Sequence, residues 1–208
     1  MTGVQADIHT KILTASTTEE LMGIYDDWAQ GYETQLLDEW GYTSPQTAVK
    51  LLASTMPLDG LHVLDAGCGT GLVGLALSKA NTVRVSGIDY SPGMLAEARQ
   101  KGVYQGLDCM DMNQPLAISA GVYDAVTCIG TFTSTHVAPE ALFELIRVTR
   151  SGGAVVFTVR DDYWAATGFA NLVADLHTSG RVVIEQIRLE PYIHSEGSKC
   201  RFVVLTVL

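Results

Sequence analysis

The sequence has few basic residues and no long apolar run. Lys and Arg together number 13 against 23 Asp and Glu, so the formal net charge is −10. A surface of this sign repels phosphate backbones and anionic headgroups, so we expect no nucleic-acid partner and no membrane partner. No window approaches the roughly 20 consecutive apolar residues that a membrane-spanning helix needs, and the N-terminal segment has no apolar stretch typical of a secretory signal. We therefore expect a cytoplasmic protein.

Cysteines are also few, and they are far apart. The four are Cys68, Cys109, Cys128 and Cys200, and no two form a CxxC pair. Scattered cysteines within apolar segments are typical of reduced thiols in a protein core. The pattern therefore favours neither a disulfide framework nor a structural zinc site, and we expect no metal.

Apolar residues make up 47% of the 208 residues, which is enough for one α/β domain with a sizeable core. Strand-like runs are found at residues 62–65, 83–89, 104–109, 124–129 and 154–159. Helix-like segments are found at residues 17–28, 44–55, 72–79, 91–101, 139–148 and about 165–178, and capping residues Thr17, Ser44 and Ser91 stand at three of their starts. Continuous apolar strands that alternate with helices predict a parallel sheet covered on both faces.

The C-terminal part follows a different pattern. Two long β-rich runs, residues 182–192 and 200–208, are joined by a short polar link that has no room for a crossover helix. The link therefore predicts an antiparallel hairpin at the end of the sheet.

The most informative stretch is VLDAGCGTG, between the first strand and the helix that follows it. Gly67, Gly69 and Gly71 leave out every second side chain where the chain turns, so a ligand can lie against the backbone beside a helix N-terminus. The second strand ends in Asp89, 20 residues after Gly69. An acid at this place can accept both ribose hydroxyls of an adenosine.

The same residues also fit a dinucleotide fingerprint, GxGxxG, through Gly69, Gly71 and Gly74. Against that interpretation, Asp65 ends the first strand, where we expect it to face the same crevice and repel a pyrophosphate. Its carboxylate suits a cationic ligand with an ammonium or sulfonium group. An NAD-dependent oxidoreductase stays the alternative.

VLDAGCGTGLVG resembles motif I of the class I S-adenosylmethionine-dependent methyltransferases, and VSGIDYSPGMLAEAR resembles their motif II. YDDWAQGYE, with the later GVYQ, resembles the small methyltransferase-like proteins of that family. The resemblance covers nearly the whole chain. It implies a Rossmann-like seven-stranded sheet with an antiparallel last strand, helices on both faces and an N-terminal helical lid. We accordingly divide the chain into a cap or lid segment, residues 1–60, and a methyltransferase core, residues 61–208.

The resemblance also implies S-adenosylmethionine as cofactor, with S-adenosylhomocysteine as product, and it assigns the residues that bind it. Asp65 would hold the ammonium end, Asp89 the ribose, Asp111 the adenine amine, and the glycines the methionine part. The predicted cofactor-binding residues are Tyr32, Asp65, Gly67, Gly69, Gly71, Asp89, Tyr90, Met94, Asp111, Met112 and Gly130.

Tyr25, Trp28 and Tyr32 are spaced by three and four residues, which places them on one face of a helix. Trp28 is expected to pack on the core. Tyr32 is the better candidate for a contact with the cofactor, in a helix that would close over the site around Gly31.

No motif in the sequence identifies a general base, and methyl transfer by in-line displacement does not require one. His136 and Arg160 follow the fourth and fifth strands and are the catalytic candidates, Arg160 also as the partner of Asp161 or Asp162. We expect a methyltransferase, monomeric or homodimeric, that acts on a small-molecule acceptor. A member of the family that binds the cofactor without transferring a methyl group is a further alternative.

Overall fold

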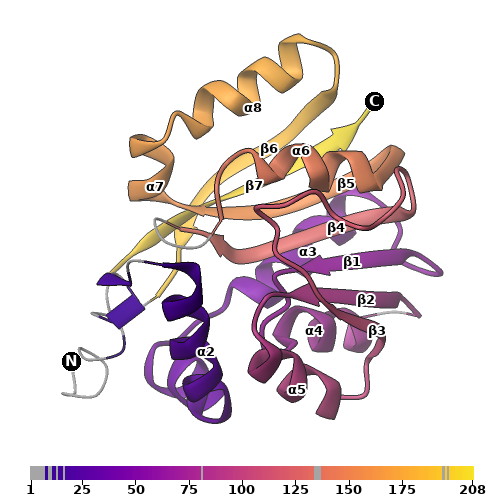
Figure 1. Cartoon of the computed structure of the whole chain (residues 1–208). Helices are drawn as coiled ribbons and strands as arrows, with labels where there is room; N and C mark the ends of the chain where they lie inside the picture. The colour runs from indigo at the N-terminus through magenta and orange to yellow at the C-terminus, as the bar shows by residue number, and fades with distance from the viewer. Residues whose placement is uncertain are drawn as a thin grey trace.

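The computed structural model describes residues 8, 11–12, 14–15, 17–80, 82–133, 137–193, 195 and 197–208. Its centre is a seven-stranded sheet with the order β3-β2-β1-β4-β5-β7-β6 (Figure 1). The strands are β1 (His62–Ala66), β2 (Arg84–Asp89), β3 (Tyr104–Cys109), β4 (Tyr123–Phe132), β5 (Thr149–Arg160), β6 (Val182–Pro191) and β7 (Lys199–Val207). Strands β1 to β5 pair in parallel, and β7 runs antiparallel to both β5 and β6. The predicted parallel sheet and C-terminal hairpin are confirmed.

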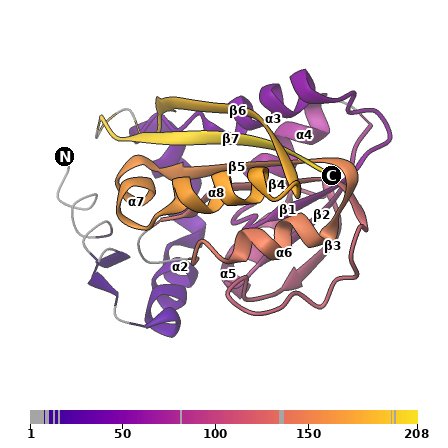
Figure 2. The same ribbon diagram turned by 90° about the horizontal axis from the view of Figure 1, so that it is seen from above.

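Helices cover both faces of this sheet, as Figure 2 shows from above. One core cluster packs α6 (Ala141–Val148) and α8 (Phe169–Thr178) against one face of β1, β4 and β5. A second cluster packs α3 (Ser44–Thr55) and α4 (Leu72–Ala80) against the other face. Because strand side chains alternate between the faces, strands buried on both sides have continuous apolar sequences.

The remaining helices are α2 (Thr18–Glu33), α5 (Pro92–Gln100) and α7 (Asp161–Ala166). The Thr17 hydroxyl accepts a hydrogen bond from the Glu20 amide at the start of α2, and the Ser91 hydroxyl accepts one from the Met94 amide in α5, as capping predicted. Ser44, in contrast, lies inside α3, whose N-cap position is Thr43. No helix in the described part of the chain is long and apolar enough to cross a membrane.

Two local features differ from the sequence prediction. The single helix expected near residues 165–178 is divided into α7 and α8 by Gly168, whose φ is +67°. A left-handed residue ends one helix and allows the next to start in a new direction. A π-helical segment, Thr34–Glu39, also follows α2. The division into segments 1–60 and 61–208 stays a prediction.

Candidate functional site

The glycine-rich turn crosses the carboxyl end of β2. The amides of Gly67 and Cys68 both donate to the carbonyl oxygen of Ile88, at 2.8 and 2.9 Å. Gly67, Gly69 and Gly71 have φ values of +69°, +54° and +93°, a region that side chains other than glycine rarely adopt. The turn therefore needs glycine for its backbone conformation at all three positions.

The three glycines differ in what surrounds them. A side chain at Gly69 would enter open space in a cavity that this residue lines. A side chain at Gly71 would meet the ring of Tyr104 at 2.9 Å and Lys101 at 3.2 Å, on the side of the turn away from the cavity. Gly69 thus offers its backbone to a ligand, whereas Gly71 allows the turn to pack closely.

Asp89 joins the end of β2 to the turn. Its Oδ2 accepts a hydrogen bond from the Gly69 amide at 2.8 Å, and its Oδ1 accepts one from the Ser91 amide at 2.9 Å. Burial raises the pKa of this carboxyl above its ordinary value, and these backbone hydrogen bonds oppose that effect. A carboxylate has about four acceptor positions, so two stay available for hydroxyl groups of a ligand.

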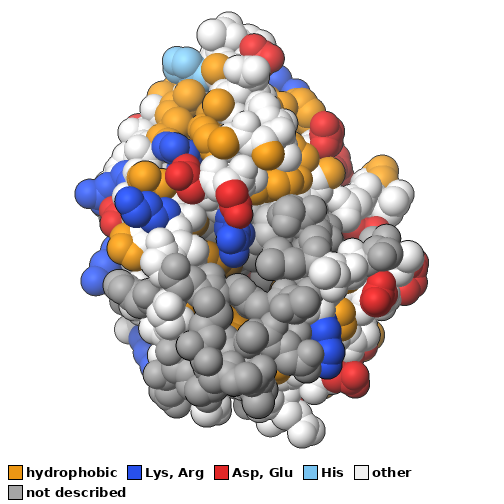
Figure 3. All heavy atoms as spheres, turned by 90° about the vertical axis from the view of Figure 1, so that its left-hand side faces the viewer, with side chains coloured by type: hydrophobic (Ala, Val, Ile, Leu, Met, Phe, Trp, Pro, Cys, Tyr) orange, Lys and Arg blue, Asp and Glu red, His pale blue; other side chains and the backbone are white. Residues whose placement is uncertain are grey.

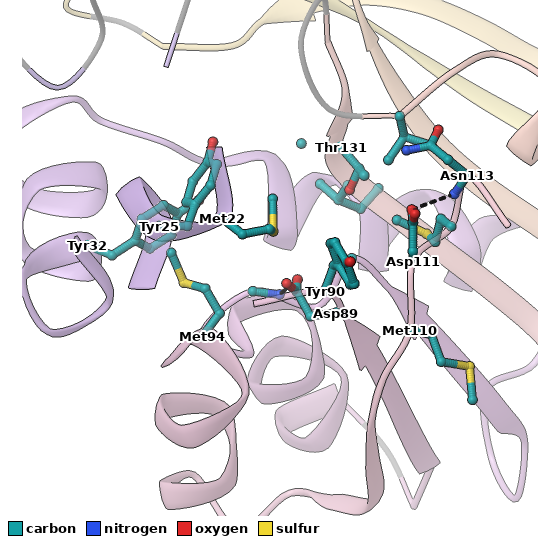
Figure 4. A pocket seen from close by; sticks show the side chains of 16 residues that line it. Met22, Tyr25, Tyr32, Asp89, Tyr90, Met94, Met110, Asp111, Asn113 and Thr131 are labelled. Atoms are coloured by element: carbon teal, nitrogen blue, oxygen red, sulfur yellow. Dashed lines mark hydrogen bonds between the residues drawn. The ribbon is translucent and has the colours of Figure 1, made fainter. Parts of the chain in front are cut away.

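A cavity that is partly open to solvent lies over the turn. Figure 4 shows Met22, Tyr25 and Tyr32 on one side and Thr131, Asp111 and Asn113 on the other, with Asp89 and Tyr90 at the base. The described lining includes two carboxylates and no Lys or Arg.

Most of the predicted cofactor-binding residues line this cavity. They are Tyr32, Gly67, Gly69, Asp89, Tyr90, Met94, Asp111, Met112 and Gly130. The lining residues that the sequence prediction missed are Met22, Tyr25, Met110, Asn113, Ile129, Thr131 and Val137. Five of the seven, Met110, Asn113, Ile129, Thr131 and Val137, lie within two residues of a predicted site residue. Their position near the ends of β3 and β4 is the feature of the sequence that could have identified them. Met22 and Tyr25 share a helix face with Tyr32.

Asp65 is not among the lining residues, so the expectation that it faces the crevice is corrected. Its side chain is buried below the turn, where Oδ2 accepts a hydrogen bond from the Tyr104 hydroxyl at 2.7 Å and Oδ1 one from the Thr127 hydroxyl at 3.2 Å. Gly71 is likewise absent from the cavity lining, and a side chain there would meet Tyr104 and Lys101. The predicted contacts of Asp65 and Gly71 with the cofactor stay predictions.

Helix α2 forms one wall of the cavity and is attached to α5. One carboxylate oxygen of Asp26 accepts hydrogen bonds from the Ser91 hydroxyl and, at 2.8 Å, from the Gly93 amide. Glu33 and Lys101 form an ion pair at the other end of α2. The helix is therefore fastened at two places beside the glycine turn.

The aromatic face of α2 divides between core and cavity. Trp28 is 7% exposed and contacts Trp40, with ring centroids 5.4 Å apart, so the prediction that it packs in the core is confirmed. Tyr32 packs edge-on against Trp28. Both Tyr32 and Tyr25 line the cavity. Burial raises the pKa of both tyrosines, so their hydroxyls stay protonated at neutral pH.

Gly130 lies where β4 passes two tyrosines. Its φ is +82°, and a side chain there would meet the Tyr42 hydroxyl at 2.9 Å and the Tyr192 hydroxyl at 3.3 Å. Glycine is therefore required here both by the backbone conformation and by the close approach of the two tyrosines. Gly130 also lines the cavity.

Of the two catalytic candidates, Arg160 is not among the described residues that line the cavity. Arg160 forms an ion pair with Asp162, at 3.0 Å, as the alternative interpretation had it, and Arg201 pairs with Asp161 at 2.8 Å. His136 lies outside the described residues. On the face drawn in Figure 3, acidic and basic side chains lie beside each other and do not form a region of one sign.

Residues 63–153 match the family model of a methyltransferase domain. Human methyltransferase-like protein 27 is 37% identical over 139 residues, which cover 65% of this chain and 56% of that protein. The chain spans about half the length of the curated relatives that it matches.

Two solved structures share the fold over most of the chain. The [4+2]-cyclase SpnF superposes with a TM-score of 0.67 at 18% identity, covering 93% of this chain and 97% of that one. A TehB-like S-adenosylmethionine-dependent methyltransferase from Corynebacterium glutamicum gives 0.66 at 22% identity, covering 88% and 98%. The resemblance seen in the sequence is supported: the chain has the fold of S-adenosylmethionine-dependent methyltransferases, and residues 63–153 match the model of a methyltransferase domain.

The residues at the cavity fit the cofactor of that family. S-adenosylmethionine carries a sulfonium, an ammonium and a carboxylate group, so its net charge is positive, and the described lining combines Asp89 and Asp111 with no basic side chain. Gly69 leaves open space where a ligand can touch the backbone. Methionine and tyrosine side chains supply apolar surface for the adenine and for the thioether of the product.

Proposed function

We propose that this protein transfers a methyl group from S-adenosylmethionine to a small-molecule acceptor. The observation that carries the proposal is the cavity itself, in which the open backbone at Gly69 and the partly buried carboxylate of Asp89 meet at the end of β2. When bound, the cofactor supplies an electrophilic methyl on a sulfonium. The chain contributes position, charge and exclusion of water.

Each part of the cavity has a proposed role. Asp89 accepts the ribose hydroxyls with the acceptor positions that its two backbone hydrogen bonds leave free. Tyr90 lies beside Asp89 and offers its ring to the adenine. Asp111 lies across the cavity, fixed by the Asn113 amide at 2.8 Å, and accepts from the adenine amine. Gly67 and Gly69 support the methionine part.

The lining also supports a proposal about the charge of the acceptor. No Lys or Arg belongs to the described lining, whereas two carboxylates do. A carboxylate or phosphate on the acceptor would find no cationic partner among these residues and would be repelled by Asp89 and Asp111. We therefore expect an acceptor that is neutral or positively charged, with an apolar part against Met22 and Tyr25.

A general base is not part of the proposal. The Tyr25 and Tyr32 hydroxyls have raised pKa values, so they donate hydrogen bonds and do not accept protons at neutral pH. In-line displacement at a methyl group can proceed by positioning alone when the acceptor is a good nucleophile in its unprotonated form, such as a neutral amine: its nitrogen–carbon bond forms as the sulfur–carbon bond breaks, and the proton of the product leaves to solvent.

A cofactor-binding protein without methyl transfer is the second candidate, because no described lining residue is suited to remove a proton. The fold likeness to a protein described as a [4+2]-cyclase makes this candidate concrete. The oxidoreductase alternative has no such support, because the matching family model is that of a methyltransferase domain.

The test is incubation of the purified protein with methyl-labelled S-adenosylmethionine and a cell metabolite extract, separated into anionic, neutral and cationic small molecules and macromolecules. We expect label in the neutral or cationic small-molecule fraction, and much less with the Asp89→Asn variant at a cofactor concentration that does not saturate it. Label in the anionic or macromolecular fraction would contradict the acceptor class. No label in any fraction, with S-adenosylhomocysteine still bound, would support the second candidate.

A further inference from the structure

The ring of Tyr104, at the start of β3, packs against three glycines, which have no side chains in its place. A Cβ atom at Gly71, Gly74 or Gly87 would lie 2.9, 2.3 or 2.9 Å from atoms of the Tyr104 ring. These glycines come from the turn, α4 and β2, three separate segments around one ring. Any side chain at these three positions would overlap the Tyr104 ring. The ring therefore packs closely against the backbone of all three glycines.

The hydroxyl group of Tyr104 contacts the carboxylate of Asp65. It donates a hydrogen bond of 2.7 Å to Oδ2, while Thr127 on β4 donates to Oδ1 at 3.2 Å. The nearby backbone of Gly74 lowers the pKa of this carboxyl. The Asp65 side chain is 1% exposed. A buried carboxylate needs such partners, because an unpaired one would cost several kcal/mol.

Asp65 stands just before the turn, and Gly74 lies in the first turn of the helix after it. A carboxylate close to the first turn of a helix stabilises the start of that helix through the helix dipole. The network through Tyr104 therefore ties together the two ends of the segment that carries Gly67 and Gly69.

We propose that Tyr104 is a positioning residue for the cofactor: its ring supports the glycine-rich turn from below and its hydroxyl holds Asp65 in place. Tyr104 does not line the cavity. It acts through Asp65 and the backbone of the turn. This inference rests on the proposed function, because it assumes that the turn binds S-adenosylmethionine.

A residue that only filled space would act through its ring, whereas a positioning residue also acts through its hydroxyl. The two differ in their effect on Asp65, whose pKa burial raises to about 6 while the hydrogen bonds from Tyr104 and Thr127 lower it. Loss of the Tyr104 hydroxyl must therefore raise the pKa of Asp65 further. Protonation of Asp65 removes the negative charge that stabilises the start of α4 near Gly74, so affinity for the cofactor should fall as pH falls through that pKa.

The other groups facing Asp65 are Cys68 in the turn, Cys128 on β4 and Asp89 at the end of β2. The pKa of the Cys128 thiol is about 12 and that of Cys68 is raised still further, so both stay neutral in the pH range of interest. Asp89 also titrates with a raised pKa, but the hydrogen bonds found for its carboxylate come from backbone amides and not from Tyr104. A shift seen only on removal of the Tyr104 hydroxyl thus belongs to Asp65.

The experiment measures S-adenosylhomocysteine binding by calorimetry between about pH 5.5 and pH 8 for the wild type, Tyr104→Phe and Tyr123→Phe. Tyr123 is a matched control, since it is a buried tyrosine of the same sheet that does not line the cavity. We expect binding to Tyr104→Phe to be about 5-fold weaker at pH 7.5, as for one lost hydrogen bond. We also expect its loss of affinity on acidification to begin at a higher pH than in the wild type.

Thr127→Val removes the other hydroxyl donor to Asp65 and should move the pH profile in the same direction. Carboxyl NMR titration of Asp65 in the ligand-free proteins provides a readout that does not depend on binding. Unchanged affinity, pH profile and Asp65 titration in Tyr104→Phe would overturn the proposal, because the ring alone would then suffice. Failure of the wild type to bind S-adenosylhomocysteine would instead overturn the proposed function.

Discussion

Asp89 holds the turn through its bonds to the Gly69 and Ser91 amides and also presents acceptor positions to the cavity. From the sequence, an acid at a strand end facing a crevice contributes little to packing, and its replacement by alanine should leave the fold intact. The structure changes that expectation. Removal of the carboxylate leaves two amides without their acceptors, at a cost of about 1–3 kcal/mol for each if they stay buried.

Asp89→Ala and Asp89→Asn should therefore differ. Asn keeps one acceptor oxygen and turns its NH2 group toward the other amide, so we expect a smaller loss of thermal stability than for Ala, with binding of S-adenosylhomocysteine weakened roughly 30-fold, or about 2 kcal/mol. Ala should weaken binding at least as much and lower the melting temperature further. Calorimetry and thermal unfolding on the same samples separate the two effects. Unchanged affinity in a folded Asp89→Asn protein would remove Asp89 from the site.

Gly69→Val tests whether the turn touches the ligand. The added side chain has a strained backbone conformation, because φ is +54°, and it occupies the open space over which the ligand should lie. Gly60 offers a matched control: its φ is +75°, a side chain there would meet nothing within 4 Å, and it does not line the cavity. Both Val variants should lose similar stability, of the order of 1 kcal/mol.

We expect only Gly69→Val to lose binding of S-adenosylhomocysteine, measured well below the melting temperatures of both variants. Equal binding by the two variants would mean that the turn does not carry the ligand.

Among the elements, α2 bears most directly on function, because it carries Met22, Tyr25 and Tyr32 into the cavity. Its aromatic face was predicted from spacing, and the structure adds the means of attachment. Asp26 binds the first turn of α5 through the Ser91 hydroxyl and the Gly93 amide. A side chain at Gly93 would lie 2.8 Å from the Asp26 carboxylate, so glycine is needed for this approach.

Asp26→Ala should loosen α2 without unfolding the sheet. Loss of a helix-capping carboxylate costs about 0.5–2 kcal/mol, and here it removes a contact between two helices. We expect faster hydrogen exchange over residues 25–33 and weaker binding of S-adenosylhomocysteine, with slower exchange on binding if the helix acts as a lid. Asp27→Ala, an exposed neighbour on the same helix, is the control. Exchange that is the same in both variants, and the same with and without ligand, would mean that α2 is a fixed packing helix.

Element order could be predicted from the sequence because it follows from local patterns: apolar runs, capping residues and a link too short for a helix. The break between α7 and α8 was missed because a glycine within a helical apolar pattern is often tolerated. Its left-handed conformation at Gly168 depends on the packing of both helices.

At the scale of the whole molecule, the residues of the cavity come from α2, the turn, β2, β4 and the segment after β3, and most of them were predicted from a family resemblance. The direction of the Asp65 side chain was not, because it is set by Tyr104, 39 residues further along the chain. Sequence spacing places a residue at a strand end. Spacing does not show whether a side chain from a distant part of the sequence forms a hydrogen bond with that residue and so directs it away from the cavity.

The central claim is that this chain binds S-adenosylmethionine at the end of β2. The most direct test is a two-dimensional NMR titration of the isotope-labelled protein with S-adenosylhomocysteine and, separately, with NAD. We predict saturable one-to-one shifts at the amides of Gly67, Gly69, Tyr90 and Asp111 with S-adenosylhomocysteine, and none at these positions with NAD. Shifts confined to the β6–β7 hairpin, equal shifts with NAD, or no shifts at saturating ligand would contradict the account.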